Sequence, residues 1–396
     1  MGMGIVHSTG NFLSVIELAH YMLVFFGWIG LVVLGSELQF YRAISGIRKF
    51  EKELHRKLFV ISLFLGVILV TIGPFISYPL ILTGLIFYFV GILLHFRWLI
   101  IIRLRKLYKF PLNYFLSAQI FHLTGVLFLF FYFLGVKAFS FRSITHIFTI
   151  GWISLVLQGA LIRALPMFIG FGIHPKFKPY LNIHHLFSVL SSILLLSGFF
   201  LEDMLFYSIG GILWILSWVF VLIVLAASFK PRPGRKFIHG VTLGFMLPGL
   251  FWSAIGAILG MMSISGISFD FEVKPVHVHL TLVAGISLLM LGALHRITTF
   301  QIFTLLYTGK RKDVEVTESS LLNDELIKKF IVFLNSSTLL LVWGFISSES
   351  WIILSGGALI FLSSLGIGWV IIKNLLLYLK EKDKALPFYL KKGEAK

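Results

Sequence analysis

Eleven long apolar runs constrain this chain more than any other feature of its sequence. They lie at 12–38, 58–75, 77–102, 114–136, 144–168, 183–200, 203–228, 238–264, 275–308, 330–347 and 350–378. A helix needs about 20 apolar residues to cross the hydrocarbon core of a bilayer. It also satisfies its backbone hydrogen bonds within its own segment, as that core demands. The sequence therefore predicts an all-α polytopic membrane protein with about eleven transmembrane helices.

Composition supports this class and narrows the chemistry. Only 13% of the 396 residues are charged, against about 25% in soluble domains. There is no cysteine, which excludes disulfides, thiolate ligands and cysteine-held iron–sulfur clusters. The 13 histidines are then the main soft metal ligands. We expect one integral membrane domain over 1–396, with a cytoplasmic tail at about 380–396.

The net charge of +17 is distributed to one side of the predicted spans. Basic loops alternate with short or acidic ones, and only Lys137, Arg142 and Lys274 of the 34 basic residues fall in the second set. Basic loops stay in the cytoplasm, so the pattern predicts an outside N-terminus and a cytoplasmic C-terminus. It fits a multi-pass protein of the cytoplasmic membrane, whose inner face carries anionic lipid. Lipid accounts for this charge, and no nucleic-acid partner is expected.

An internal repeat links the fifth and ninth spans. The segments HIFTIGWISLVLQGALIR from His146 and HLTLVAGISLLMLGALHR from His279 match at eight of 18 positions. A fainter copy lies in the first span, where GWIGL at 27–31 resembles GWISL at 151–155. Repeats are a common way to build membrane folds. The repeated glycines allow either close helix approach or room for a flat ligand.

The repeat sets histidines at similar depth near the predicted outer face. They are His20, His146 and His279 on spans one, five and nine, which are four spans apart. Ionisable side chains inside a membrane are costly and suggest function. His277 precedes His279 by two residues, and each residue turns a helix by about 100°. One helix could therefore offer these two histidines to different cofactors.

This plan resembles that of heme–copper oxidase subunit I, which has three arcs of four helices with histidines on equivalent helices. In that family a His-x-His pair on the tenth helix ligates a high-spin and a low-spin haem, the latter together with a histidine of the second helix. The eleven spans here would map onto helices two to twelve. His20 and His279 would then ligate the low-spin haem, His277 the high-spin haem, and His146 would match the histidine that binds copper.

The chain also resembles NnrS-type membrane haem proteins. AHYML at 19–23 is similar to their AHEML-like start of a span, with Tyr21 in place of the acid. LGFMLPGL at 243–250 is similar to their LGY-x-x-LP-x-G span, and the run from His279 to Arg296 is similar to the span that follows it.

The sequence departs from the oxidase pattern at the copper site. His146 is followed by Ile147, Phe148 and Thr149 in place of the family's catalytic polar residues. The oxidase His-His pair lies at an outer helix end, whereas His184 and His185 lie at the predicted inner start of span six. The sequence thus does not supply the full ligand set of a copper site.

Each candidate also has a structural interpretation. His277 and His279 could be a polar helix end solvated at the interface, and His20 a hydrogen-bonded structural residue. Arg142, one turn before His146, is placed to bind a haem propionate, but it could equally be an interfacial anchor. A weaker inner set could line a quinol pocket, a second cofactor site or a proton route, or simply snorkel at the interface; it comprises His184, His185, His239 and His295.

The resemblances imply a haem b-binding membrane protein that takes part in respiratory electron transfer or in oxygen or nitric oxide handling near the outer face. They imply one low-spin haem, with a second, high-spin haem as a further expectation. Partners would be lipid, other respiratory subunits or a cytochrome or quinol electron donor, and a small gas. Whether the protein is an enzyme, as an oxygen or nitric oxide reductase, stays open. The alternative is a secondary transporter whose membrane histidines bind substrate or protons.

Overall fold

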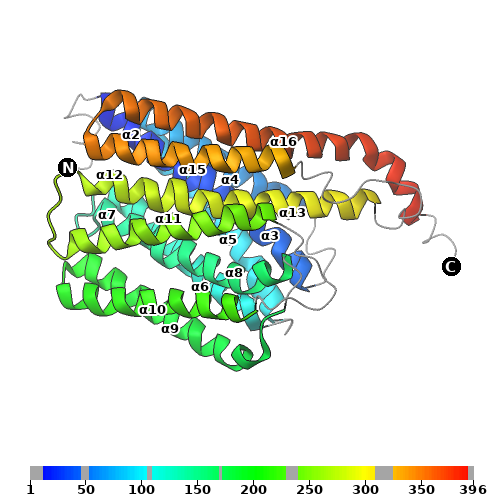
Figure 1. Ribbon diagram of the computed structural model, residues 1–396, viewed down its shortest axis with the longest axis horizontal. Coiled ribbons are helices and arrows are strands. Elements are labelled where there is room, and N and C mark those ends of the chain that lie inside the picture. The colour runs from blue at the N-terminus through cyan, green and yellow to red at the C-terminus, as the bar shows by residue number, and fades with distance from the viewer. Residues whose placement is uncertain are drawn as a thin grey trace. The chain divides into compact units, whose positions relative to one another are not determined.

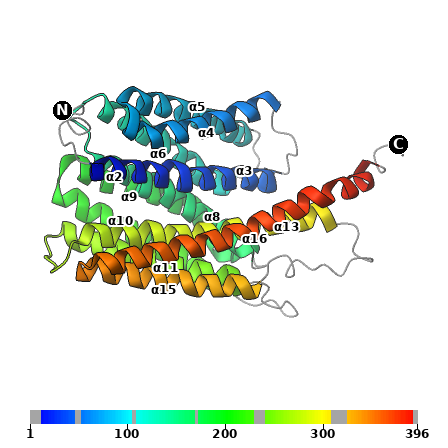
Figure 2. The ribbon, with the colours of Figure 1, turned by 90° about the horizontal axis from the view of Figure 1, so that it is seen from above.

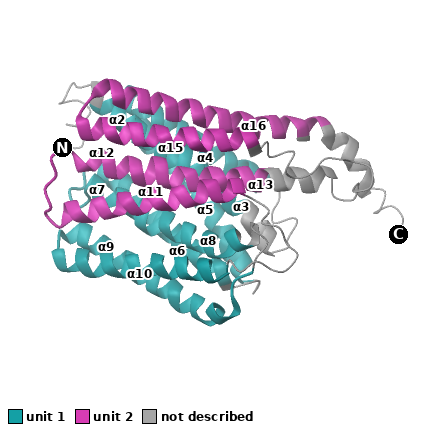
Figure 3. Cartoon of the chain, viewed as in Figure 1, with its two compact units in different colours: residues 1–238 teal, residues 239–396 magenta. Residues whose placement is uncertain are grey.

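The computed structural model describes residues 12–45, 53–104, 109–168, 172–228, 240–307 and 324–390. All regular structure in these residues is helical, and eleven of the helices are long and apolar enough to cross a membrane. The predicted all-α polytopic class is therefore confirmed. Two compact units divide the chain, unit 1 over 1–238 and unit 2 over 239–396 (Figure 3), and each is described by itself.

Seven spans lie in the described residues of unit 1, and the first and fifth are built from three consecutive segments. The first span runs through α2 (Phe12–Met22), η1 (Leu23–Gly30) and α3 (Leu31–Ser45), which follow one another along one line (Figure 2). The others are α4 (Glu53–Ile76), α5 (Tyr78–Leu104), α6 (Lys109–Phe133), then α7 (Phe141–His146) with η2 (Ile147–Ile153) and α8 (Ser154–Phe168), the short η3 (Pro175–Tyr180) with α9 (Leu181–Leu201), and α10 (Met204–Ser228).

Unit 2 contains four spans that run alongside one another (Figure 1). They are α11 (Gly240–Ile264), the composite of α12 (Val273–Val278), η4 (His279–Ile286) and α13 (Ser287–Tyr307), then α15 (Asp324–Ser347) and α16 (Ser350–Leu390). Residues 391–396 of the predicted tail lie outside the described residues.

The observed helix ends differ from the predicted ones where polar residues extend a helix beyond its apolar run. The second run begins at 58, but α4 begins at Glu53, because one polar turn precedes the apolar residues. That turn carries an exposed ion pair in which Lys57 Nζ lies 3.0 Å from Glu53 Oε1. Hydropathy predicts the buried part of a span and does not detect such a solvated turn.

Small residues let neighbouring helices of unit 1 approach closely. A Cβ on Gly66 of α4 would lie 2.6 Å from the backbone N of Tyr88 on α5, and one on Gly84 of α5 would lie 2.7 Å from the N of Val70. Only Ser77 separates α4 from α5, so the two helices form a tight antiparallel hairpin. Such interfaces are typical of membrane helices, where packing and not the hydrophobic effect drives association.

Candidate functional site

Each of the three spans that carry the repeated histidine changes to π-helix at or just after it. The π-helical segment η1 begins three residues after His20, η2 begins directly after His146, and η4 begins at His279. In the register of the sequence repeat, η2 and η4 end at equivalent residues, and α-helix resumes at the aligned Ser154 and Ser287. Short π-helical segments are rare and are often found at functional sites. The sequence repeat is therefore also a repeat of an unusual local structure.

The imidazole rings of two of these histidines are held in the same way. Nδ1 of His146 lies 2.8 Å from the carbonyl oxygen of Arg142, and Nδ1 of His279 lies 2.8 Å from that of Pro275. A carbonyl only accepts, so Nδ1 carries the hydrogen and, in a neutral ring, Nε2 carries the lone pair. Histidines that ligate metals usually donate their other N–H in this way. Both rings thus have the tautomer that ligates a metal through Nε2.

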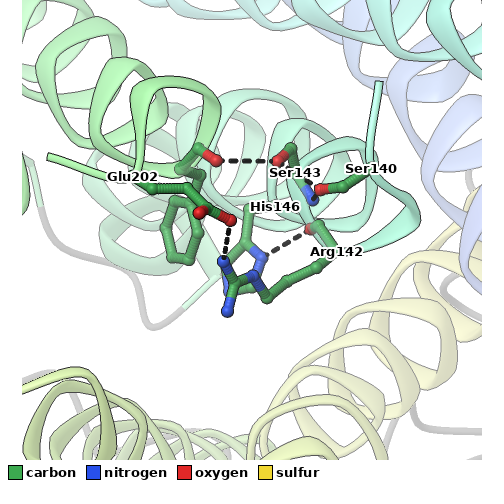
Figure 4. A network of polar contacts seen from close by, with 6 residues as sticks. Ser140, Arg142, Ser143, His146 and Glu202 are labelled. Atoms are coloured by element: carbon green, nitrogen blue, oxygen red, sulfur yellow. Dashed lines mark hydrogen bonds and ion pairs between the residues drawn. The ribbon is translucent and has the colours of Figure 1, made fainter. Parts of the chain in front are cut away.

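The surroundings of His146 fix its ring in place (Figure 4). The ring stacks on Phe199 of α9, with centroids 3.7 Å apart and an angle of 21° between the planes. Ser143 Oγ donates to the carbonyl oxygen of Phe199 over 2.9 Å, and Ser140 Oγ accepts from the backbone N–H of Ser143 at the start of α7. These contacts join the start of α7 to the end of α9 and so orient the histidine.

Arg142, predicted to bind a haem propionate, contacts a protein carboxylate in this structure (Figure 4). Its Nη2 donates to Glu202 Oε1 over 3.2 Å, and the two side chains are 57% and 75% exposed. Glu202 ends α9 with a φ of 54°, and Asp203 Oδ1 accepts from the N–H of Leu205 as the cap of α10. The propionate role of Arg142 stays a prediction.

His277 and His279 face different helices, as their spacing predicts. His277 Nδ1 lies 2.6 Å from the carbonyl oxygen of Gly256 on α11, and a Cβ on Gly260 would lie 2.6 Å from the same imidazole ring. The ring of His279 packs on Phe345 of α15, with centroids 4.8 Å apart. If His277 and His279 each bind a cofactor, the two cofactors would therefore lie on different sides of this helix.

The glycines of the repeat are used for close helix packing. A Cβ on Gly151 of η2 would lie 2.6 Å from the ring of Phe121, and one on Gly285 of η4 would lie 2.0 Å from Ser253 Oγ. A Cβ on Gly30 of η1 would lie 2.3 Å from the hydroxyl of Tyr88. Of the two interpretations of these glycines, close approach is the one this structure bears out.

A small apolar pocket lies beside His20 and His146 within unit 1. It is lined by α2, η1, α6, α7 and η2, including Tyr21 and Thr145, the sequence neighbours of the two histidines. Its accessible space is about 10 Å³, which is about the space that one water molecule needs. A haem bound through His20, whose side chain is exposed, would therefore lie outside this pocket.

The inner candidates that can be described are buried within the protein. His184 donates from Nε2 to the carbonyl oxygen of Ser217 over 2.9 Å and accepts from the hydroxyl of Tyr114 at Nδ1. His185 Nε2 lies 2.9 Å from the hydroxyl oxygen of Ser117. His184 and His185 therefore have structural partners. His295 is also buried, and His239 lies outside the described residues.

Sequence reasoning missed a buried polar cluster in unit 1. His95 Nε2 of α5 lies 2.6 Å from Glu37 Oε2 of α3, and Gln119 Nε2 of α6 donates to the same oxygen over 2.8 Å. His122, also on α6, lies with its Nδ1 3.3 Å from Gln119 Oε1. A signal was present, because Glu37, His95 and His122 are each ionisable groups inside apolar runs. Nothing in the sequence indicated that three helices bring them together.

The described residues contain no group of three or more His, Asp or Glu side chains placed to hold a metal ion. Comparison with known proteins adds no family: no protein-family model and no curated protein matches the sequence.

Proposed function

We propose that the chain is a haem b-binding protein of the cytoplasmic membrane, similar to heme–copper oxidase subunit I and NnrS-type proteins. The observation that supports this is the unit repeated in spans one, five and nine, a histidine followed by a π-helical segment. In two of the three copies the histidine also donates Nδ1–H to the carbonyl four residues earlier. Repeated presentation of Nε2 near one end of the spans is what axial ligation of haem iron requires.

The proposed role of this chain's own residues is to hold and orient the imidazoles. The carbonyls of Arg142 and Pro275 accept from Nδ1–H of His146 and His279 and so fix the tautomer in which Nε2 is the nitrogen that could ligate iron. Phe199 and Phe345 supply apolar walls against the two rings, and such walls tune a haem's potential. A bound haem would supply reversible one-electron chemistry and, if five-coordinate, a site for a gas.

The pairing of His20 with His279 about one low-spin haem joins residues of different units, and the sequence alone supports it. The second, high-spin haem on His277 is also supported by the sequence alone. In this proposal the N-terminus is outside, the basic loops are cytoplasmic, and the haem end faces outward. The electron donor would be a cytochrome, a quinol or another respiratory subunit, and oxygen or nitric oxide would be the gas. The copper partner of the oxidases is not proposed.

The experiment is an absorption spectrum of the full chain purified from haem-replete cells, with haem quantified per chain. We expect a Soret band and a reduced α-band. His279→Ala should lower the haem content, and His55→Ala, at the start of α4, is the matched control. Correctly inserted protein without haem would overturn the proposal and favour the alternative of a secondary transporter, for which the buried Glu37–His95 pair is the specific observation.

A further inference from the structure

The cluster of Glu37, His95, Gln119 and His122 is a deeply buried set of polar groups in unit 1. Glu37 is 2% exposed, and the other three are 0% exposed. The cluster draws on α3, α5 and α6, and each member lies within a membrane span. Ionisable groups at such depth are costly and point to ion or proton pathways.

Hydrogen-bond geometry fixes much of the proton arrangement. Glu37 Oε2 accepts from the amide N–H of Gln119, which leaves Gln119 Oε1 as the acceptor for His122. His122 Nδ1 therefore carries a hydrogen, and in the neutral ring Nε2 holds a lone pair. The short contact of 2.6 Å between His95 Nε2 and Glu37 Oε2 is typical of a charge-assisted hydrogen bond, in which one proton is held between the two groups.

Some polar atoms of this region have no hydrogen-bond partner within the described part of the chain. They include Glu37 Oε1, His122 Nε2 and the hydroxyl of Tyr88, whose ring lies edge-on to His122 with centroids 5.6 Å apart. An unsatisfied buried polar group costs about 1–3 kcal/mol. Polar sites of this kind are satisfied by internal water, which usually makes about three hydrogen bonds.

The walls of the cluster are aromatic and exclude bulk solvent. His122 stacks on Trp152 of η2, with centroids 3.5 Å apart and an angle of 13°, and Phe59 of α4 stacks on His95. The titratable groups that face Glu37 are therefore His95 on α5 and, through Gln119, His122 on α6. Arg56 and Lys57 on α4 and Arg97 on α5 are exposed. These charged side chains therefore do not face the cluster.

We propose that Glu37, His95, Gln119 and His122 form a buried proton-binding site that exchanges its proton through internal water. Glu37 and His95 share the bound proton, and Gln119 couples the pair to His122. The protonated pair holds two hydrogens, either as imidazolium with carboxylate or as neutral imidazole with carboxylic acid. Loss of one leaves a neutral His95 that donates Nε2–H to the ionised Glu37, and uptake restores the second hydrogen at His95 Nδ1 or on the carboxylate of Glu37. The site does not depend on haem, so it stands whether or not the proposed function does.

The test is infrared difference spectroscopy of the full chain in lipid nanodiscs, between acidic and alkaline buffer and between H₂O and D₂O. We expect carboxyl and imidazole signals that change together at one apparent pKa and exchange with D₂O. Glu37→Gln should remove both signals, a loss of one titrating site per chain. Glu17→Gln is the matched control, because Glu17 is an exposed carboxyl on the same span, and it should retain them.

Labelling with ¹³C-glutamate keeps the test decisive if Glu37→Gln fails to fold, since the wild-type carboxyl band must then shift. Glu37→Asp should preserve a titrating band at a changed position. Water O–H bands that shift in H₂¹⁸O should disappear with Glu37→Gln. A wild-type protein without a titrating, labelled carboxyl band that exchanges with D₂O would overturn the proposal, as would unchanged imidazole signals in Glu37→Gln.

Discussion

Removing His95 alone should cost more stability than replacing both partners of the buried Glu37–His95 pair. His95→Leu would leave the Glu37 carboxylate with Gln119 as its remaining donor, and breaking a buried ion pair in this way costs about 3–5 kcal/mol. Glu37→Met would leave a neutral imidazole N–H without its acceptor, which costs about 1–3 kcal/mol. Replacing both with apolar residues removes the desolvation problem, so the double variant should lose less than about 3 kcal/mol.

The two single losses total about 4–8 kcal/mol, so a double loss below about 3 kcal/mol predicts a coupling free energy of at least about 1 kcal/mol, within the range for contacting residues. The free energy of unfolding can be measured in mixed micelles of lipid and dodecyl sulfate, followed by tryptophan fluorescence. The control cycle uses Glu53 and Lys57, an exposed pair four residues apart on α4, where a coupling of about 0.3–0.5 kcal/mol is expected. Additive losses at Glu37 and His95, or a milder loss for His95→Leu than for Glu37→Met, would refute the reasoning.

Three further outcomes are expected. Gly30→Val should destabilise unit 1 by about 1–3 kcal/mol, because a Cβ there would lie 2.3 Å from the hydroxyl of Tyr88; Gly35→Val, at a position with open space, should cost less, and equal losses would contradict the packing. If a second haem is present, His277→Ala should abolish carbon monoxide binding in the reduced protein and leave the low-spin α-band, and surviving gas binding would rule out that ligand. Protease added outside intact cells should not cleave the chain after Lys380, and cleavage there would reverse the proposed orientation.

The sequence predicted the spans well because the bilayer imposes one simple requirement, a long apolar helix. The repeat was also detectable, since matched residues around His146 and His279 are close in sequence. The π-helical segments were not predictable, because the hydropathy of an apolar run depends on its residues and not on whether they form α- or π-helix.

The Glu37–His95 pair shows another feature that could not be predicted from the sequence. The two residues are 58 positions apart on the chain, so their contact depends on how α3 and α5 pack, which hydropathy and local motifs do not specify. Glu37 lies near the end of the apolar run 12–38 and His95 in the later part of the run 77–102, which gives depth but no direction around the helix axis. His184 is a similar case, because Tyr114 and Ser217 satisfy it from two other spans.

The π-helical segment after His146 sets the angular position of that residue. Relative to an unbroken α-helix, a π-bulge holds one extra residue, and one residue corresponds to about 100° of rotation and 1.5 Å of rise. If all residues from His146 to Ser154 formed α-helix with α8 held in place, His146 would turn away from Phe199 by about 100°. Deleting a single residue between Ile147 and Ile153 would let α-helix form and leave His146 facing Phe199. The direction in which this histidine points is therefore determined by the length of the segment that follows it.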